Sequence, residues 1–193
     1  MSSSSNDGDY LKRLPPEYYR GDACVHWTMT IDERKTGWLV PNFYFKFREL
    51  LTHTMFRYGI CCPVFCLMPD HIHLLWLGIL QSADQRLAMK FLRGQLHPVL
   101  EKHHVRLQDQ AYDHVLRDNE RQLIALQNVV EYTARNPERK RLVPDDGFRD
   151  YVYTGCLIPG YPNLTPLQQD FWSLFDRLCS KLRHEGMIHG TRQ

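Results

Sequence analysis

The segment from Met68 to Trp76, which reads MPDHIHLLW, constrains the fold more than any other part of this chain. Its Pro-Asp pair predicts a tight turn between two apolar strands, at 60–68 and 71–79, and therefore a hairpin. Because alternate residues of a strand point to the same face, His71 and His73 project side by side. Two adjacent imidazoles can chelate a divalent metal ion, although histidines in a half-buried sheet can also simply bind backbone carbonyl groups. A metal site would need further ligands.

A predicted helix over residues 119–136 supplies candidate partners for the histidines. Apolar residues recur there at intervals of three and four, which is the pattern of an amphipathic helix. At about 100° per residue, Tyr132 lies roughly 120–180° around the helix from this apolar stripe, so core packing does not explain it. Asn136 follows one turn later, on the same face as Tyr132. The apolar stripe consists of Leu123, Leu126, Val130 and Ala134.

The order of the predicted elements is that of a ferredoxin-like α+β fold, an antiparallel sheet with helices on one face. The other face is then free for the active site, and we expect His71 and His73 on it. His26, in the first strand, could reach the same site or could simply belong to the polar side of its strand. The predicted strands are 23–31, 60–68, 71–79 and 106–117, and the predicted helices are 43–58, 82–102 and 119–136.

Three regions differ in composition. Residues 1–14 begin with a polar, Ser-rich stretch and are expected to be disordered. Residues 15–145 carry all the motifs and predict one catalytic domain. Residues 146–193 form a C-terminal extension, with a stretch rich in Gly and Pro followed by a predicted docked helix at about 166–184.

The ordered motifs resemble those of one known family. The chain is similar to the single-tyrosine HUH transposases, and most similar to their branch of REP-associated tyrosine transposases. The resemblance covers roughly residues 15–145. The family's MPxHxHLL strand is matched by Met68 to Leu75, its Tyr-x-x-x-Asn-Pro helix end by Tyr132, Asn136 and Pro137, the segment leading into that helix by 111–120, and its first strand by 18–28.

The resemblance implies a chemistry for these residues. Tyr132 would be the nucleophile, and His71, His73 and Asn136 would hold a divalent metal, Mg²⁺ or Mn²⁺, although imidazoles alone would suit zinc equally well. Attack on DNA would leave a 5′-phosphotyrosine and a free 3′-hydroxyl, so a second strand end could be joined without ATP. The sequence does not identify a general base.

The family also implies a substrate and leaves the assembly open. Single-stranded DNA next to a hairpin is the expected partner, because an exposed strand offers an accessible phosphate. The protein is expected to be a monomer or a homodimer, and Tyr132 could serve the histidines of its own chain or of a partner. Two departures concern DNA specificity: the glycine that usually follows Asn136-Pro137 is missing, and Arg93 stands where the family often has lysine.

The net charge is only +2, so nucleic acid would be held by local clusters of positive charge. The clearest cluster follows the proposed nucleophile directly along the chain. A charge run is often only a solvated face, and its position beside a candidate phosphodiester-cleaving site is what favours phosphate binding. The DNA-binding candidates are Arg93, Arg117, Arg121, Arg135, Arg139, Lys140 and Arg141.

Two other functions are compatible with parts of the pattern. Histidine-triad nucleotide hydrolases carry a His-x-His-x-His strand, but Leu75 occupies the place of the third histidine and argues against them. A domesticated DNA-binding protein that keeps this fold without cleaving would leave the retention of Tyr132, His71, His73 and Asn136 unexplained. An assay for a covalent protein–DNA adduct separates that reading from the transposase.

Composition sets the expected compartment. No apolar run is long enough to span a bilayer, and the first residues lack the apolar core of a secretory signal, so no membrane association is expected. The six cysteines show no C-x-x-C pair and several lie in apolar stretches. Reduced, buried thiols are expected, and with them a cytoplasmic location.

Overall fold

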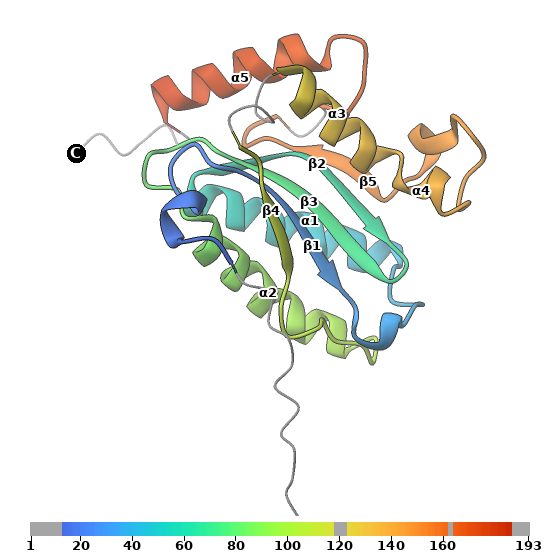
Figure 1. The fold of residues 1–193 in the computed structure, drawn as a ribbon. Coiled ribbons are helices and arrows are strands. Elements are labelled where there is room, and N and C mark those ends of the chain that lie inside the picture. Colours follow the sequence, from blue (N-terminus) through green and yellow to red (C-terminus); the bar gives the residue numbers. More distant parts are fainter. Residues whose placement is uncertain (1–12, 118–122, 162–163, 187–193) are drawn as a thin grey trace, which may run out of the picture.

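The computed structural model describes residues 13–117, 123–161 and 164–186 (Figure 1). The expected disordered segment 1–14 lies mostly outside these ranges, and so does Arg121. The strands are β1 (Cys24–Thr30), β2 (Ile60–Met68), β3 (His71–Gly78), β4 (Tyr112–Val115) and β5 (Thr154–Leu157). The α-helices are α1 (Pro41–Tyr58), α2 (Gln85–Glu101), α3 (Leu123–Ala134), α4 (Asn136–Arg139) and α5 (Phe171–Glu185), and the 3₁₀ turns are η1 (Pro16–Tyr19), η2 (Asp32–Arg34) and η3 (Gly147–Asp150).

The described strands form one antiparallel sheet in the order β4-β1-β3-β2-β5. Its first four members have the order expected of a ferredoxin-like fold, and β5 adds a fifth strand beside β2. The predicted hairpin is present, since Met68 pairs with His71 across the turn between β2 and β3. The α+β fold class is therefore confirmed.

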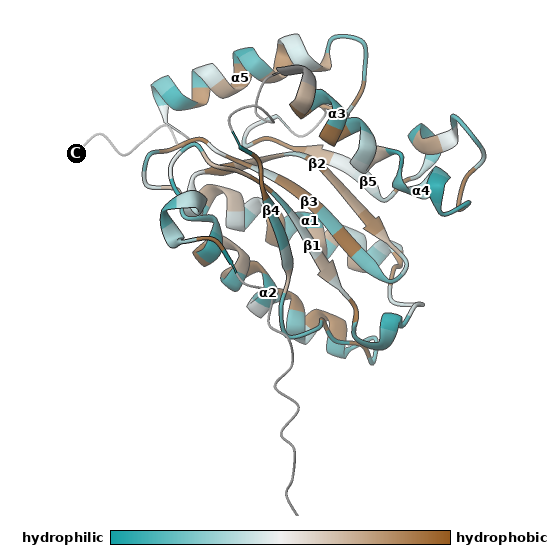
Figure 2. Ribbon diagram, in the orientation of Figure 1, coloured by the Kyte–Doolittle hydropathy of each residue, from teal (hydrophilic) through white to brown (hydrophobic). Residues whose placement is uncertain are grey.

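Helices α1 and α2 cover one face of the sheet. The side chains that point toward them alternate along the strands with the histidines, as the two-residue period requires. This core is apolar and rich in aromatic rings, and Figure 2 shows the hydrophobic colouring of the central strands that border it. Its largest buried members include Trp27, Trp76, Phe47, Phe65 and Trp38.

The opposite face is not free of helices, which corrects one expectation. Leu75, on the same face of β3 as His73, packs in a second core with Val130 of α3 and Phe175 of α5. The expected docked C-terminal helix is thus present, although it begins at Phe171 rather than near residue 166. Helix α3 is amphipathic, so its apolar stripe is removed from water when the helix packs against this face of the sheet. His71 and His73 lie at the start of β3, beside the hairpin turn.

Two strand predictions differ from the structure. The strand expected at 106–117 is regular only over Tyr112–Val115, with one isolated bridge between Ile31 and Leu107 before it. The short β5 was not expected, because a Gly/Pro-punctuated stretch predicts a loop. At Gly155 the ring of Phe65 comes so close that an added Cβ would lie 2.5 Å from its Cζ atom, so only glycine fits there.

Candidate metal and nucleophile site

The rings of His71 and His73 converge on one point of the sheet surface. Both residues lie in the first, turn-proximal part of β3. On the same face of the sheet, Thr30 of β1 is the cross-strand partner of His71, and Thr28 is the partner of His73. The Nε2 atoms of the two histidines are 2.9 Å apart, and the rings are nearly perpendicular. His71 is 7% exposed. The side-by-side arrangement expected from strand alternation is therefore present.

The other nitrogen of each ring is held by a neighbour. The Nδ1 atom of His71 lies 2.5 Å from a carboxylate oxygen of Asp70, which can only accept, so this Nδ1 carries the proton. The Nδ1 atom of His73 lies 3.1 Å from the hydroxyl of Thr28, which can donate or accept. These two contacts fix the orientation of both rings and direct both Nε2 atoms to the same point. Without a metal, a proton on the Nε2 of His73 can bridge to the Nε2 of His71.

The surroundings keep His73 uncharged. Burial, followed by the nearby charges of His26, His71 and Arg139, lowers the pKa of His73 to about 3, while Asp70 opposes this shift. A neutral imidazole is the form that binds a metal. The ring of His26 stacks on that of His73 at a centroid distance of 5.2 Å, so the first-strand histidine does reach this site.

Burial also lowers the pKa of His26, to about 4, with a smaller contribution from His114. Its Nε2 atom is buried and has no hydrogen-bond partner among the described residues. His26 therefore supports the ring of His73 by stacking and holds no polar contact of its own at that nitrogen.

Tyr132 lies near the end of α3 with 57% of its surface exposed, which agrees with its position off the apolar stripe. The guanidinium of Arg139 lies 3.7 Å from the centroid of the Tyr132 ring and donates a hydrogen bond to the backbone oxygen of Tyr132. Helix α4 contacts β2, and Cys66 of β2 pairs with His73 of β3. Arg139 therefore joins Tyr132 to a helix that packs against the strand next to the histidines.

Asn136 opens α4 and is 6% exposed. Its Nδ2 atom donates to the backbone oxygen of Thr133 at 3.2 Å. This contact orients the carboxamide and leaves its oxygen as the atom that could bind a cation. Within the part of the chain that the structure describes, no three His, Cys, Asp or Glu side chains gather as a metal site.

The cations around the tyrosine differ in their contacts. Arg135 is held by Glu131 and Glu138 at 2.9 Å and by Asp146 at 3.1 Å, and its guanidinium lies over the ring of Phe148. Arg135 therefore connects the start of α4 to η3, and few of its N–H donors remain to bind a phosphate. Lys140, Arg141 and Arg117 are exposed at the surface.

Arg93 lies away from this site. It belongs to α2, on the sheet face opposite the histidines, and donates to the backbone oxygens of Gln108 and Asp109. The structure thus places Arg139 against Tyr132 and α4 against β2, the strand next to the histidines, and leaves Arg93 outside this region. Sequence reasoning missed the positioning role of Asp70, which directly precedes His71, and of Thr28, which lies two residues after His26 on the polar side of β1.

The described helices include none that combines the length and hydrophobicity of a bilayer-spanning segment. No family model and no curated protein matches the sequence. Among solved structures, the chain is similar to a REP-associated tyrosine transposase bound to a REP hairpin, with a TM-score of 0.60 and 15% identity over 74% of this chain and 82% of that one. The resemblance read from the motifs is therefore confirmed at the level of the fold, and the chain has the fold of a REP-associated tyrosine transposase.

Proposed function

We propose that this protein is a metal-dependent transesterase that cleaves and rejoins single-stranded DNA through a 5′-phosphotyrosine, at sites flanked by a hairpin. The observation that carries the proposal is the convergence of the His71 and His73 Nε2 atoms, 2.9 Å apart. The Arg139–Tyr132 pair supports it, because α4 contacts β2, the strand beside the histidines. The hairpin is suggested by the solved structure of similar fold, which is a transposase bound to a REP hairpin.

The residues present fit a divalent ion. The Nε2 atoms of His71 and His73 lie 2.9 Å apart, close enough for one ion to contact both. The family resemblance implies Mg²⁺ or Mn²⁺, whereas imidazole ligands alone would suit zinc equally well. His71, His73 and the amide oxygen of Asn136 would hold the ion. When bound, it would neutralise charge on the non-bridging oxygens of the scissile phosphate.

The protein's own groups would act as follows. The Tyr132 hydroxyl oxygen forms a bond to phosphorus while the bond from phosphorus to the 3′-oxygen breaks, and the departing oxygen takes up a proton. No side chain is assigned as the general base. The proton of the Tyr132 hydroxyl would therefore pass to water or to the DNA. Arg139, which already contacts the ring and main chain of Tyr132, would bind a phosphate oxygen beside the nucleophile. The reverse attack by another 3′-hydroxyl rejoins a strand.

The test is the covalent adduct itself. A single-stranded oligonucleotide with a hairpin, labelled on either side of the cut, is incubated with protein and Mn²⁺, and denaturing gels report protein bound to the 5′-phosphate end. Tyr132→Phe should abolish the adduct and retain DNA binding. Tyr112→Phe is the matched control, because Tyr112 is also exposed and lies on the same sheet face, opposite Thr28. Binding without any adduct would instead support a non-cleaving DNA-binding protein.

The same assay addresses assembly. The protein is proposed to act as a monomer or a homodimer. Mixing a His73→Ala variant with a Tyr132→Phe variant restores the adduct only if the tyrosine of one subunit serves the histidines of another. Sedimentation in the same buffer gives the oligomeric state.

A further inference from the structure

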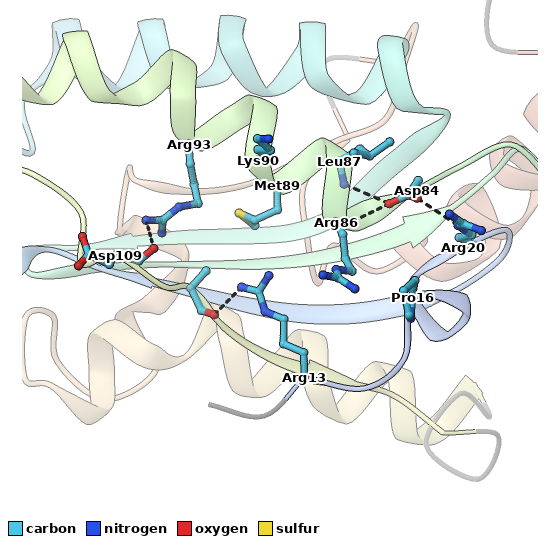
Figure 3. A pocket seen from close by; sticks show the side chains of 11 residues that line it. Arg13, Pro16, Arg20, Asp84, Arg86, Leu87, Met89, Lys90, Arg93 and Asp109 are labelled. Carbon is cyan, nitrogen blue, oxygen red and sulfur yellow. Dashed lines mark hydrogen bonds and ion pairs between the residues drawn. The ribbon is translucent and has the colours of Figure 1, made fainter. Parts of the chain in front are cut away.

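A basic groove lies on α2, away from the histidine site. Its floor and walls come from the N-terminal half of α2, the segment around η1 and the chain just before β4 (Figure 3). The cavity measures about 510 Å³. We call it the α2 groove, and its charged lining residues are Arg13, Arg20, Arg86, Lys90, Arg93, Asp84 and Asp109.

The groove and the candidate site lie on opposite faces of the sheet. Met89 of the groove packs in the same core as Ile72 and Leu74, whose side chains alternate with those of the histidines. His71 and His73 point to the face that carries α3. A polymer bound in the groove would therefore leave the candidate site accessible.

The carboxylates of the groove do not cancel its positive charge. Asp84 caps α2 by accepting from the backbone N–H groups of Arg86 and Leu87, and its second oxygen accepts from Arg20 at 3.1 Å. Arg20 is thus paired with Asp84, and Arg13 forms an ion pair with Asp113 at 3.1 Å, which leaves Arg86, Lys90 and Arg93 against Asp109. The groove keeps a net positive charge.

Three of the cations form a stripe along one face of α2. Arg86, Lys90 and Arg93 are spaced by four and three residues, which places them on neighbouring turns. Lys90 is exposed, Arg86 lies over the ring of Tyr19 at 5.8 Å, and the Nη1 atom of Arg93 is buried without a hydrogen-bond partner among the described residues. A buried guanidinium nitrogen with an unused donor is costly unless a ligand or water accepts from it.

We propose that the α2 groove binds the sugar-phosphate backbone of DNA at a second position on the protein. Among the described residues that line the groove there is no aromatic side chain on which a base could stack, whereas a row of cations on a helix matches the spaced charges of a phosphate backbone. The inference rests on the proposed function only for the identity of the polymer. Contacts of this kind position nucleic acid without reading its sequence.

The experiment measures equilibrium binding without divalent ions, so that cleavage does not compete. A fluorescent hairpin DNA and an unstructured single strand of equal length are titrated by anisotropy over a series of NaCl concentrations. In the double variant Arg86→Gln/Lys90→Gln, the slope of log affinity against log salt should become shallower by roughly 1.4 to 1.8, from about 0.7 to 0.9 per lost contact. The matched control, Lys46→Gln/Arg177→Gln, removes the same charge at exposed positions on α1 and α5 and should leave the slope unchanged.

Each result decides the proposal. A shallower slope for the hairpin alone assigns the groove to a duplex stem, and one for both DNAs assigns it to backbone of either form. An unchanged slope for both DNAs, or an equal change in the control, overturns the proposal. If the double variant unfolds at a lower temperature than the unmodified protein, the single variant Lys90→Gln is measured instead. Lys90 is exposed, so this substitution should remove one phosphate contact without affecting the fold. The adduct assay separately tests Tyr132, so failure of the groove and failure of the transesterase are distinguishable.

Discussion

The guanidinium of Arg139 stacks on the ring of Tyr132, 3.7 Å from its centroid, and also donates a hydrogen bond to the backbone oxygen of the same residue. This double contact joins α4 to the end of α3 across a break at Arg135, whose backbone leaves the helical region. One cation thereby positions the proposed nucleophile and lies close enough to the histidine end of the sheet to lower the pKa of His73.

Replacing Arg139 should therefore affect chemistry far more than folding. Arg139→Gln removes a charge that would stabilise the phosphate during attack, and the rate of adduct formation should fall on the order of 100-fold. The free energy of unfolding should change by only about 0.5–1 kcal/mol, because the stacked pair is exposed. Arg139→Lys should recover part of the rate, since it keeps the charge but loses the planar contact.

The control for this prediction is Arg141→Gln, which removes the same charge two residues later at an exposed position. Single-turnover adduct formation at saturating DNA compares the variants. Equal rates for Arg139→Gln and the unmodified protein would contradict a role for Arg139 in the reaction.

Thr28 should act on the metal through His73. The hydroxyl of Thr28 contacts Nδ1 of His73 at 3.1 Å and so fixes the ring that presents Nε2. Thr28→Val keeps a β-branched side chain in the strand and removes only this contact, and it should weaken Mn²⁺ binding by roughly 10 to 100-fold. Titration calorimetry with Mn²⁺ measures the affinity directly.

Thr30→Val is the matched control, because Thr30 lies on the same face of β1 opposite His71 and the described residues provide no side-chain hydrogen bond to it. Mn²⁺ affinity should be unchanged in this variant. If Thr28→Val binds Mn²⁺ as tightly as the unmodified protein does, the hydroxyl has no part in orienting His73.

Local patterns predicted the part of the site that lies within single elements. The His-x-His spacing and the Pro-Asp turn place both imidazoles on one strand face, because the strand period and turn chemistry act over only a few residues. The exposure of Tyr132 followed from the helix period in the same way.

Contacts between distant segments could not be predicted from such patterns. Thr28 reaches His73 only because β1 pairs with β3 in one particular register. The sequence predicts Arg135 as a DNA contact, but in the fold its guanidinium forms ion pairs with Glu138 and Asp146. The cover that α3 and α5 provide on the second face likewise depends on tertiary packing, which sequence periodicity does not specify.

The turn after α4 offers a test of phosphate binding near the cut. Lys140 and Arg141 are exposed, unlike Arg135, and could contact the DNA backbone. Replacing both with Gln should weaken single-strand binding at every sequence and make its salt dependence shallower by about 1.4, from roughly 0.7 per contact. The position of the cut should not move. An unchanged salt dependence would mean that this turn is only a solvated surface.

Tyr19 should make the stability of the protein fall at high pH. Its side chain is fully buried beneath Arg86 and donates a hydrogen bond to Asp113. Burial, followed by the hydrogen bond to Asp113 and its charge, raises the pKa of Tyr19 to about 12, above an ordinary value of 10.0. Between these two values the unfolded chain loses the proton first and binds fewer protons than the folded one, so the free energy of unfolding must fall as the pH rises from 10 to 12.

Tyr19→Phe removes this titration and should lose less stability over the same pH window, although it is less stable than the unmodified protein below pH 10 because the hydrogen bond to Asp113 is gone. Urea denaturation at several pH values measures both effects, and the difference between the two proteins cancels the titration of the other tyrosines and the lysines. Tyr18→Phe is the control, since Tyr18 is 53% exposed and should behave as the unmodified protein does. A parallel pH dependence in the Tyr19→Phe variant and the unmodified protein would show that Tyr19 titrates alike in the folded and unfolded states, and would contradict this prediction.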